Sequence, residues 1–456
     1  MSAGKIQLAA IGAQDLYLTG NPQITYFKAV YRRHTNFAVS TEELTFNTNP
    51  SKEASNCSVT LSKNGDLISN IYIQAEFEQK AADAGGNSYI NWTNNTGAAY
   101  IEECWIKIGQ HEIDRHSSLW LDVYNELTDH TNSEYLGLNK HLAKNTYLKS
   151  NSNKLPKLLL NIPLKFWFNR NPGLALPIGA LIHSDVKVHF KFRALKHLIN
   201  KTPDGTAVDF EDLSGKVKCF VDYVHLSSDE LKRFTQKPIE YLIETLQVLP
   251  DKLLEPTVKI EFSHPIKELI WVMNNTGRLE KDGTIVASTV DATKNISINN
   301  TDTSYKDGGQ GNDYFNYQPG STSSSSVDVK IAALGQYGGS NATEWFNLVS
   351  LKINGSERNI KRNPYYYRHI QPLQAHHKIP SKHIYLYSFA LTPEDYSPSG
   401  TCNFTHVSSA ELSFTDINGI TGGDEATTNS KRITIFAVTY NILRISGGRG
   451  GVAYSN

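Results

Sequence analysis

Histidines are the residues of this sequence whose spacing could support chemistry. His111 and His116 lie five positions apart, and His376, His377 and His383 cluster in the segment QAHHKIPSKHIY. Metal ligation requires neutral imidazoles that converge on one ion, usually together with cysteine or carboxylate ligands. Neither group has such neighbours at a regular spacing, so the pattern predicts hydrogen-bonded or exposed histidines. A pH-sensitive contact at His376 and His377 is the alternative.

Short motifs of the common enzyme classes are absent from the sequence. It has no GxSxG nucleophile elbow, no GxxxxGK[ST] phosphate loop and no HExxH zinc motif. The segment GGQGNDYF is rich in glycine, but no helical pattern follows it, so it does not predict a phosphate-binding loop. We therefore predict no catalytic, cofactor-binding or metal-binding residues and no enzymatic function.

The N-terminal segment predicts a short helix with basic residues near its end. Asn21 suits an N-cap and Pro22 suits the first helical turn. Apolar residues then recur at helical spacing, at Ile24, Phe27 and Tyr31. The basic cluster comprises Lys28, Arg32, Arg33 and His34. It is either an inward docking arm that contacts a neighbouring subunit or an internal partner, or a set of local ion pairs at a helix end.

Composition excludes several classes of protein. The 456 residues include 45 basic and 45 acidic residues, whereas a protein that wraps nucleic acid needs a basic excess, so we expect no direct sequence-specific contact with nucleic acid. The first residues lack the apolar core of a signal peptide, and no apolar run reaches the roughly 18 residues of a membrane span. The cysteines form no CxxC pair, which predicts buried free thiols in a reducing compartment: Cys57, Cys104, Cys219 and Cys402.

Alternating apolar and polar residues predict short strands along most of the chain. Examples are 57–61, 71–77, 186–192 and 217–223, and the run LLLNIPLKFWF predicts another strand. Short helices are predicted at 119–127 and from Ser227, which with Glu230 forms a possible capping box. The resulting domains are an N-terminal arm with a short helix at 1–36, a β domain at 37–227, a linker helix at 228–238 and a second β domain at 239–456.

Three pairs of segments repeat in the same order in the two β domains. NGDLISNIYI matches SHPIKELIWV, WIKIGQHEIDR matches SLKINGSERNI, and HSDVKVHF matches SSAELSF. Each match is weak by itself, but the conserved order predicts a duplicated β domain. The second domain also contains a polar stretch at about 274–327, which is too long for an ordinary loop and predicts an exposed surface projection.

Several long segments resemble major capsid proteins of nucleocytoplasmic large DNA viruses. The family's amino-terminal segment resembles residues 12–37, GAQDLYLTGNPQITYFKAVYRRHTNF, and its central motif is similar to residues 163–181, PLKFWFNRNPGLALPIGAL. Its carboxy-terminal motif is similar to residues 370–404, IQPLQAHHKIPSKHIYLYSFALTPEDYSPSGTCNF. The ending YNILRISGGRGGVAYSN resembles algal-virus members. The resemblance spans nearly the whole chain, with no motif match at 274–327.

This resemblance implies an all-β protein of two consecutive eight-stranded jelly-roll β-sandwiches with short helices and long loops. It further implies a homotrimer with a pseudo-hexagonal outline that tiles an icosahedral virion shell around an internal membrane. The implied partners are neighbouring capsomers, minor capsid and penton proteins, and internal membrane-associated proteins, after synthesis and assembly in the host cytoplasm. The stretch 274–327 is then expected outside the shell and the N-terminal arm inside it.

Two turns in the family motifs predict architectural roles. Pro172 and Gly173 in RNPGLALP, and Pro398 and Gly400 in SPSGTCNF, suit turns before the next strand. Other functions remain open alternatives: a minor or scaffolding double-jelly-roll capsid protein, a carbohydrate-binding β-sandwich module with aromatic-lined pockets, or a cupin-like enzyme, which would need clustered metal ligands.

Overall fold

The described residues of the N-terminal unit of the protein are exposed to solvent. The computed structural model describes residues 2–78, 80–81, 90–93, 95–128, 154–201, 210, 213, 215–275, 314–315, 317, 344–417 and 431–454. These form two compact units, Met1–Phe37 and Ala38–Asn456. The first contains two short helices, α1 (Ala3–Ala9) and α2 (Leu16–Thr19), and its described residues are all exposed.

The helix predicted after Asn21 is wrong. Turns and irregular backbone follow this residue, and Asn21 itself is left-handed with a φ of 50°. A short helix is only marginally stable unless its apolar face packs against another element. The apolar residues that suggested it, Ile24, Phe27 and Tyr31, are 67%, 99% and 87% exposed.

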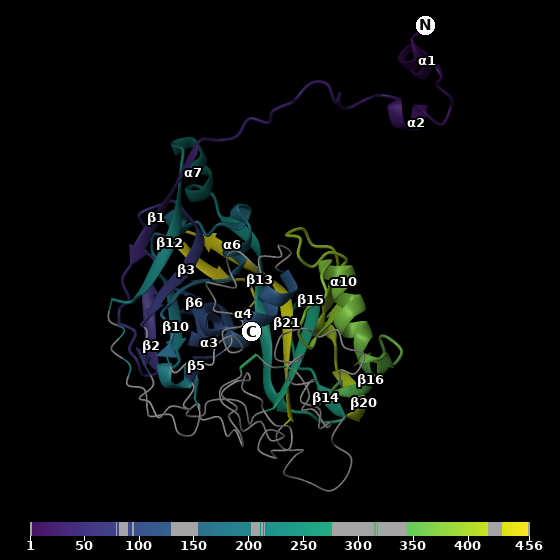
Figure 1. Cartoon of the computed structure of the whole chain (residues 1–456). Coiled ribbons are helices and arrows are strands. Elements are labelled where there is room, and N and C mark those ends of the chain that lie inside the picture. Colours follow the sequence, from purple (N-terminus) through teal and green to yellow (C-terminus); the bar gives the residue numbers. More distant parts are fainter. Residues whose placement is uncertain are drawn as a thin grey trace. The chain divides into compact units, whose positions relative to one another are not determined.

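The second unit begins with a β-sandwich of eight main strands (Figure 1). In chain order they are β1 (Phe37–Leu44), β2 (Ser55–Thr60), β3 (Leu67–Phe77), β6 (Ile101–Ile108), β7 (His111–Ser117), β9 (Leu158–Pro163), β10 (Val186–Phe192) and β12 (Val217–Leu226). The sheets run β1-β12-β3-β9 and β2-β10-β6-β7. Numbered along the chain, these orders are 1-8-3-6 and 2-7-4-5, the topology of a jelly roll.

A second sandwich repeats this topology after helix α7 (Ser228–Thr235). Its eight main strands are β13 (Ile239–Leu253), β14 (Thr257–Lys259), β15 (Pro265–Asn275), β16 (Phe346–Ile353), β17 (Ser356–Glu357), β18 (Ile384–Ser388), β20 (Ala410–Ile417) and β21 (Lys431–Ser446). The sheets run β13-β21-β15-β18 and β14-β20-β16-β17, again 1-8-3-6 and 2-7-4-5. Two short strands extend the first sheet, β19 (Cys402–Asn403) beside β15 and β22 (Arg449–Val452) beside β21. The expected pair of eight-stranded jelly rolls is confirmed.

The three repeated segment pairs occupy equivalent places in the two sandwiches. NGDLISNIYI and SHPIKELIWV include the first residues of the third strands, β3 and β15, and HSDVKVHF and SSAELSF include the first residues of the seventh strands, β10 and β20. WIKIGQHEIDR and SLKINGSERNI form the hairpins of the fourth and fifth strands. Both hairpin turns use left-handed residues, Gly109 in the first and Asn354 with Gly355 in the second. The duplication predicted from the sequence is therefore a duplication of topology.

The central strands of the β13-β21-β15-β18 sheet, β21 and β15, are buried on both faces. Ile433 and Ile435 of β21 lie in the core of the second sandwich, whereas the intervening Phe436 lies in a core shared with the first sandwich. Trp120 of helix α4 (Ser118–Thr128) packs on Phe436 with ring centroids 5.3 Å apart. A strand that is covered on both faces carries a continuous apolar run, which explains the sequence ITIFAV in β21. We call this contact between the two sandwiches the seam.

Three aromatic residues of the connection between β15 and β16 are buried against the first sandwich. Tyr314, Phe315 and Tyr317 are 2%, 2% and 1% exposed, and all three belong to the shared core. The projection expected at 274–327 is therefore not exposed at these positions. Its first two residues end β15, and its other residues lie outside the described part of the chain.

The carboxylate of Asp122 in α4 joins three segments at one edge of the seam. It accepts hydrogen bonds from Lys382 (2.7 Å to both oxygens), from the Tyr317 hydroxyl (2.8 Å) and from the Asn95 amide (2.7 Å). The Lys382 ammonium also lies 5.3 Å and 5.5 Å from the ring centroids of Phe315 and Tyr317. One buried ion pair thus connects the first sandwich, the second sandwich and the aromatic segment between β15 and β16.

Two further local predictions differ from the structure. The strand predicted for LLLNIPLKFWF ends at Pro163, and Trp167–Arg170 form helix α6, because Trp167 and Phe168 turn into the core. Helix α7 begins after Ser227 as expected, but the Ser227 side chain makes no cap hydrogen bond, so the capping box is not formed.

Replacing Lys382 by methionine tests the ion pair at Asp122. Lys382→Met leaves a fully buried carboxylate without its cation, and the loss of one partner of a buried pair costs about 3–5 kcal/mol of unfolding free energy. Ser381→Ala is the matched control, because it removes only the neighbouring hydrogen bond to Glu126 and should cost under about 1 kcal/mol. Urea unfolding at one protein concentration measures both losses. Equal losses would show that the ion pair does not connect the sandwiches.

Candidate functional site

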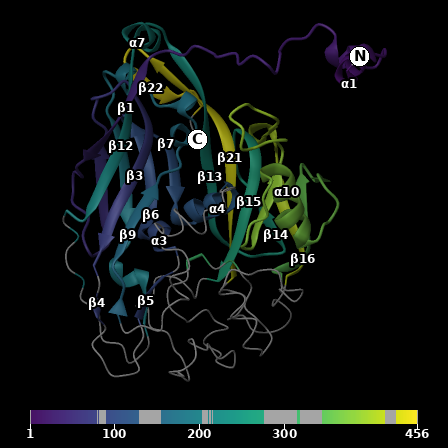
Figure 2. The same cartoon turned by 45° about the horizontal axis from the view of Figure 1, so that its top comes forward.

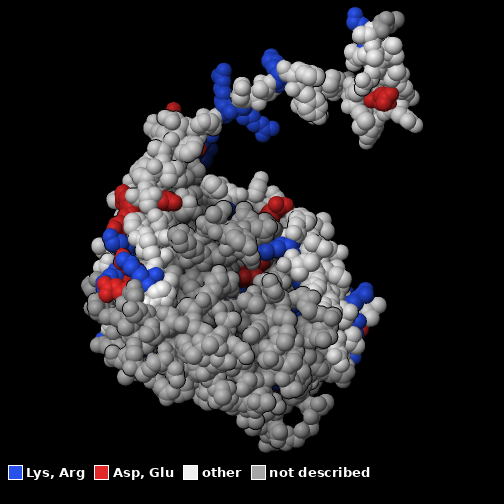
Figure 3. All heavy atoms as spheres, viewed as in Figure 1, with Lys and Arg blue, Asp and Glu red and all other residues white. Residues whose placement is uncertain are grey.

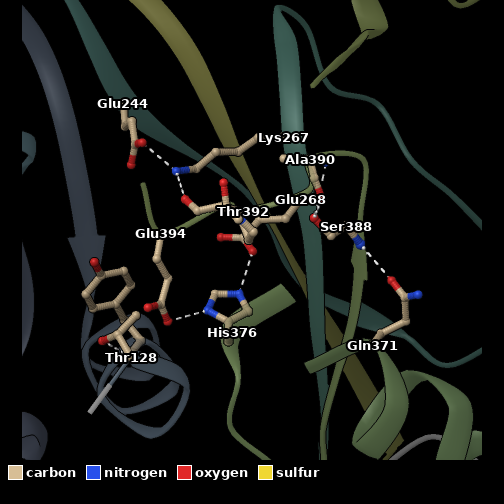
Figure 4. A network of polar contacts seen from close by, with 12 residues as sticks. Thr128, Glu244, Lys267, Glu268, Gln371, His376, Ser388, Ala390, Thr392 and Glu394 are labelled. Atoms are coloured by element: carbon tan, nitrogen blue, oxygen red, sulfur yellow. Dashed lines mark hydrogen bonds and ion pairs between the residues drawn. The ribbon is translucent and has the colours of Figure 1, made fainter. Parts of the chain in front are cut away.

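Among the described residues, a group of ionisable side chains lies at the seam and centres on His376. Helix α10 (Gln371–His376) ends at this residue and points its imidazole between two carboxylates (Figure 4). The Nε2 atom lies 2.8 Å from Glu268 on β15, and the Nδ1 atom lies 2.7 Å from Glu394 in the loop after β18. The imidazole is therefore held on both nitrogens by acidic partners, with 3% of its side chain exposed.

These carboxylates keep His376 protonated. Burial by itself would lower the pKa of the imidazole, but Glu268 and then Glu394 outweigh burial and raise the pKa to about 9. Burial would likewise raise the pKa of Glu268, but His376, Lys267 and Arg170 lower it below its usual value. Near neutral pH the His376 imidazole is therefore protonated and the Glu268 carboxylate is ionised.

Two cations complete the group. Lys267, on β15 next to Glu268, contacts Glu244 of β13 and the carbonyl oxygen of Pro393. Arg170, at the end of α6 in the first sandwich, reaches the same Glu244 at 2.5 Å. Glu244 therefore links the first sandwich to β15. The three cations and three carboxylates of this group balance, and we call them the seam cluster: Arg170, Glu244, Lys267, Glu268, His376 and Glu394.

The seam cluster lines a cavity of about 290 Å³. Each of its six charged groups already contacts another member of the cluster, so the charges are satisfied within the chain. A general base must be unprotonated near the working pH, whereas the two carboxylates favour the protonated form of His376. The arrangement can hold two sandwiches in one orientation, and the described part of the chain contains no group of three metal-ligating side chains.

The remaining candidate histidines do not meet. His111 is exposed in the turn-proximal end of β7, while His116 is buried in the same strand at 3.0 Å from Asp114. His377 is exposed next to the buried His376, and His383 is buried near Glu344. His111 and His377 are exposed, as the sequence predicts, whereas neither ring nitrogen of the buried His116 forms a hydrogen bond with a described residue.

The predicted docking arm is exposed. Lys28, Arg32, Arg33 and His34 lie in irregular backbone, and none forms an ion pair with another described residue. Figure 3 shows the basic residues along this unit, whose sequence to Phe37 contains Lys5 and Asp15 besides the cluster. The helix-end alternative is wrong, because no helix forms there. A docking role stays a prediction.

The predicted architectural turns lie at equivalent points of the two sandwiches, between the sixth and seventh strands. Pro172 begins a short 3₁₀ helix, and the Asn171 side chain accepts a hydrogen bond from Gly173 N at 2.8 Å. Gly400 has a φ of 138°, and a Cβ placed there would lie 2.8 Å from the carbonyl oxygen of Phe389. Pro398 is exposed in the same loop.

The aromatic and cysteine residues bear on two other expectations. All four cysteines are free thiols, with Cys57, Cys104 and Cys219 buried and Cys402 half-buried. Five of the six tryptophans are buried, and the sixth, Trp105, is stacked on His189 and covered by Arg115 at 4.3 Å. No tryptophan ring offers the open platform that a carbohydrate-binding module would use. Within the described residues no helix is long and apolar enough to cross a membrane.

The sequence missed five of the six members of the seam cluster. The sequence indicates only His376. Its acidic partners Glu268 and Glu394 are 108 and 18 positions away in the chain, so no local pattern connects them to the histidine. One signal was present: Lys267 and Glu268 interrupt the apolar run of β15, and charged residues inside a two-faced buried strand require partners.

The strand order and the closed seam define a double jelly-roll protein of the viral capsid type. Residues 25–227 match the family model described as the major capsid protein N-terminus, and residues 230–451 match the model of the large eukaryotic DNA virus major capsid protein. This chain belongs to the family of major capsid proteins of large eukaryotic DNA viruses, which makes it a virion shell component. That family is structural and is not an enzyme family.

Similar proteins extend over the full chain. A major capsid protein of Pyramimonas orientalis virus is 34% identical, and one of Paramecium bursaria Chlorella virus 1 is 31% identical, each over 100% of both chains. The capsid protein in a quasi-atomic model of the PBCV-1 virus capsid is 27% identical, with a TM-score of 0.68 over 95% of this chain and 100% of that chain. The Faustovirus major capsid protein has the same TM-score at 11% identity, over 96% of this chain and 94% of that chain, and shows the fold alone.

The pH dependence of stability tests the seam cluster. The pKa of His376 is raised in the folded protein to about 9, so its stabilisation is full below its unfolded pKa of about 6.5 and is lost as the pH rises through 9. Relative to the variant Glu268→Gln/His376→Gln, the wild type should lose on the order of 3 kcal/mol of unfolding free energy over this interval. Denaturant unfolding at a series of pH values measures the difference. A constant difference would contradict a protonated His376.

The two glycine turns make a matched pair. Gly400→Ala should cost about 1–3 kcal/mol, because alanine must adopt a strained φ and its Cβ approaches a carbonyl oxygen. Gly173→Ala should cost under about 1 kcal/mol, because φ is not positive there and the nearest atom, Asn171 Oδ1, lies 3.2 Å from the added Cβ. Thermal unfolding compares them. An equal or reversed order would remove the architectural role of Gly400.

Proposed function

We propose that three copies of this chain form a pseudo-hexagonal capsomer and that these capsomers tile the virion shell. The supporting observation is that both sandwiches share the strand orders 1-8-3-6 and 2-7-4-5. Three chains then supply six similar sandwiches around one axis, so that a three-fold object fills a six-fold position of a lattice. We further propose that 37–227 and 239–456 are the two repeating domains, with 228–238 as their linker.

The N-terminal arm is proposed to dock on another protein of the virion. Within its own unit, large apolar side chains are exposed with no core to enter, among them Leu18, Tyr26 and Phe27 at 82%, 90% and 99%. Contiguous exposed apolar residues in a folded protein mark interaction sites. Neighbouring capsomers, minor capsid and penton proteins, and internal membrane-associated proteins are the proposed partners. The arm is proposed to lie inside the shell.

The connection between β15 and β16 is proposed to face outward. Both β13 and β15 pair antiparallel with β21, so they run in the same direction. The end of β15 therefore lies at the opposite end of the sheet from the start of β13, which follows the linker helix α7. If the linker end faces the interior, the long connection leaves from the exterior end.

We also propose that the chain is synthesised in the host cytoplasm and that it has no catalytic activity.

Sedimentation of the purified chain tests the capsomer. We expect a species with the mass of three chains and, by electron microscopy, a pseudo-hexagonal outline. A monomer at micromolar concentration would overturn the proposal. A chain without residues 2–36 is the companion variant: it should still form the trimer, because the sandwiches carry the contacts, but it should fail to enter shells in infected cells. Normal incorporation of this variant would overturn the role of the arm.

A further inference from the structure

The loop between β18 and β19 forms part of the wall of the cavity at the seam cluster. Residues 393–396 of this loop line the cavity together with residues of α4 and α6 from the first sandwich and of β13, β15 and α10 from the second. Figures 1 and 2 show β13, β21 and β15 between the first sandwich and the strands β14 and β16. The cavity therefore lies where the two sandwiches meet, and we call residues 391–399 the cavity loop.

Two polar contacts attach the tip of the cavity loop to the seam cluster. The Glu394 carboxylate lies 2.7 Å from Nδ1 of His376, and the carbonyl oxygen of Pro393 accepts a hydrogen bond from Lys267 (Figure 4). Pro393 is buried, but the one large aromatic ring of the tip, Tyr396, is 67% exposed. Apolar burial therefore contributes little to the attachment of the tip, which depends on these polar contacts.

The base of the cavity loop is closed by bonds that do not involve the cavity. The backbone N–H of Thr392 donates to Ser399 Oγ at 3.0 Å, and that of Leu391 donates to the Ser399 carbonyl oxygen at 3.3 Å. Just before the loop, the N–H of Phe389 donates to the Lys267 carbonyl oxygen at 2.8 Å, which fixes the start of the loop to β15. The tip can thus leave the cavity while the base stays in place.

Glu394 is the most solvent-exposed carboxylate of the seam cluster. Its side chain is 29% exposed, compared with 13% for Glu244 and 4% for Glu268, so water screens its charge interactions most. Glu244 contacts two cations. Although burial acts in the opposite direction, three neighbouring cations lower the pKa of Glu268. We therefore expect Glu394 to be the first of the three to gain a proton as the pH falls.

His376 cannot compensate for that proton. Burial lowers the pKa of the imidazole, but Glu268 and then Glu394 raise it to about 9, so His376 stays protonated throughout the acid range. Protonation of Glu394 therefore leaves three cations and two carboxylates in a cluster that was balanced. A buried charge that loses its partner is costly, and a hydrogen bond to a neutral acceptor is weaker than one to a carboxylate.

The other ionisable groups around the cluster do not replace this response. Burial raises the pKa of Tyr124 on α4 and raises that of Tyr440 on β21 to about 12, so both phenols stay neutral in acid. Asp114 on β7 faces Arg170 from the first sandwich and accepts two backbone hydrogen bonds. Asp395 lines the cavity next to Glu394, but its carboxylate forms no ion pair with a described residue. Asp395 therefore provides a control.

We propose that the cavity loop is an acid-sensitive latch, in which protonation of Glu394 breaks its ion pair with His376, releases the tip of the loop from the seam cluster and opens the cavity between the two sandwiches. The contact between the sandwiches is then firmer at neutral pH than in an acidic compartment. This latch belongs to the single chain and does not depend on the proposed capsomer.

A distance between two nitroxide labels, measured by pulsed electron paramagnetic resonance, reports the release. One label is attached at Ser397→Cys in the loop tip and the other at Gly173→Cys in the first sandwich, both exposed positions. The background is Cys402→Ser, since the other three cysteines are buried. We expect a narrow distance distribution at neutral pH. Near pH 4, where carboxylates gain protons, it should shift to longer distances and broaden, and it should narrow again on return to neutral pH.

Three variants connect the release to Glu394. Glu394→Gln imitates the protonated carboxyl group and should give the broad distribution already at neutral pH. Glu394→Ala removes the acceptor and defines the distribution of the fully released tip. Asp395→Asn is the matched control: it removes the neighbouring carboxylate and should keep both the narrow distribution at neutral pH and the response to acid.

Circular dichroism at both pH values separates loop release from unfolding. A narrow distribution for Glu394→Gln at neutral pH would overturn the proposal, because a neutral side chain would then hold the loop. A folded wild type that keeps its narrow distribution near pH 4 would overturn it as well, as would an Asp395→Asn variant that is released at neutral pH. If the wild type unfolds near pH 4, the comparison of Glu394→Gln with the wild type at neutral pH decides the matter.

Discussion

The central strands β21 and β15 of the second sandwich have to bury both of their faces, and the arrangement of the two sandwiches depends on this constraint. One face closes the second sandwich, and the other is apolar and would be exposed in an isolated domain. Helix α4 covers it, with Trp120 on Phe436. The two jelly rolls are therefore not independent domains, because an apolar face of the second is buried only by its contact with the first.

A seam that is mostly apolar sets no unique orientation by itself, since apolar contacts are not directional. Two sets of ion pairs fix the orientation of the sandwiches. The first is the pair of Asp122 and Lys382. In the second, Glu244 of the seam cluster binds both Arg170 of the first sandwich and Lys267 of the second. A buried ion pair adds little net stability compared with an apolar pair, but it is costly to break, so misaligned arrangements are disfavoured.

A shell protein gains from such a construction. A seam that slides would change the orientation of the two sandwiches and therefore the outline of the protein. The buried Tyr314, Phe315 and Tyr317 extend this logic to the connection between β15 and β16, since they attach it to the neighbouring sandwich.

The sequence by itself determined the strands, the duplication and the absence of familiar catalytic motifs. The alternation of apolar and polar residues at 71–77 and 186–192 predicts which side chains face inward. The similar hairpin segments WIKIGQHEIDR and SLKINGSERNI indicate that the same unit occurs twice. It also contained the turns at Gly173 and Gly400. Only the tertiary structure decided that His376 meets Glu268, that Tyr317 enters the first sandwich, and that the helix predicted after Asn21 does not form. The physical reason is that periodicity records whether a face is buried, whereas its partner depends on residues that are distant in the chain and adjacent only after folding.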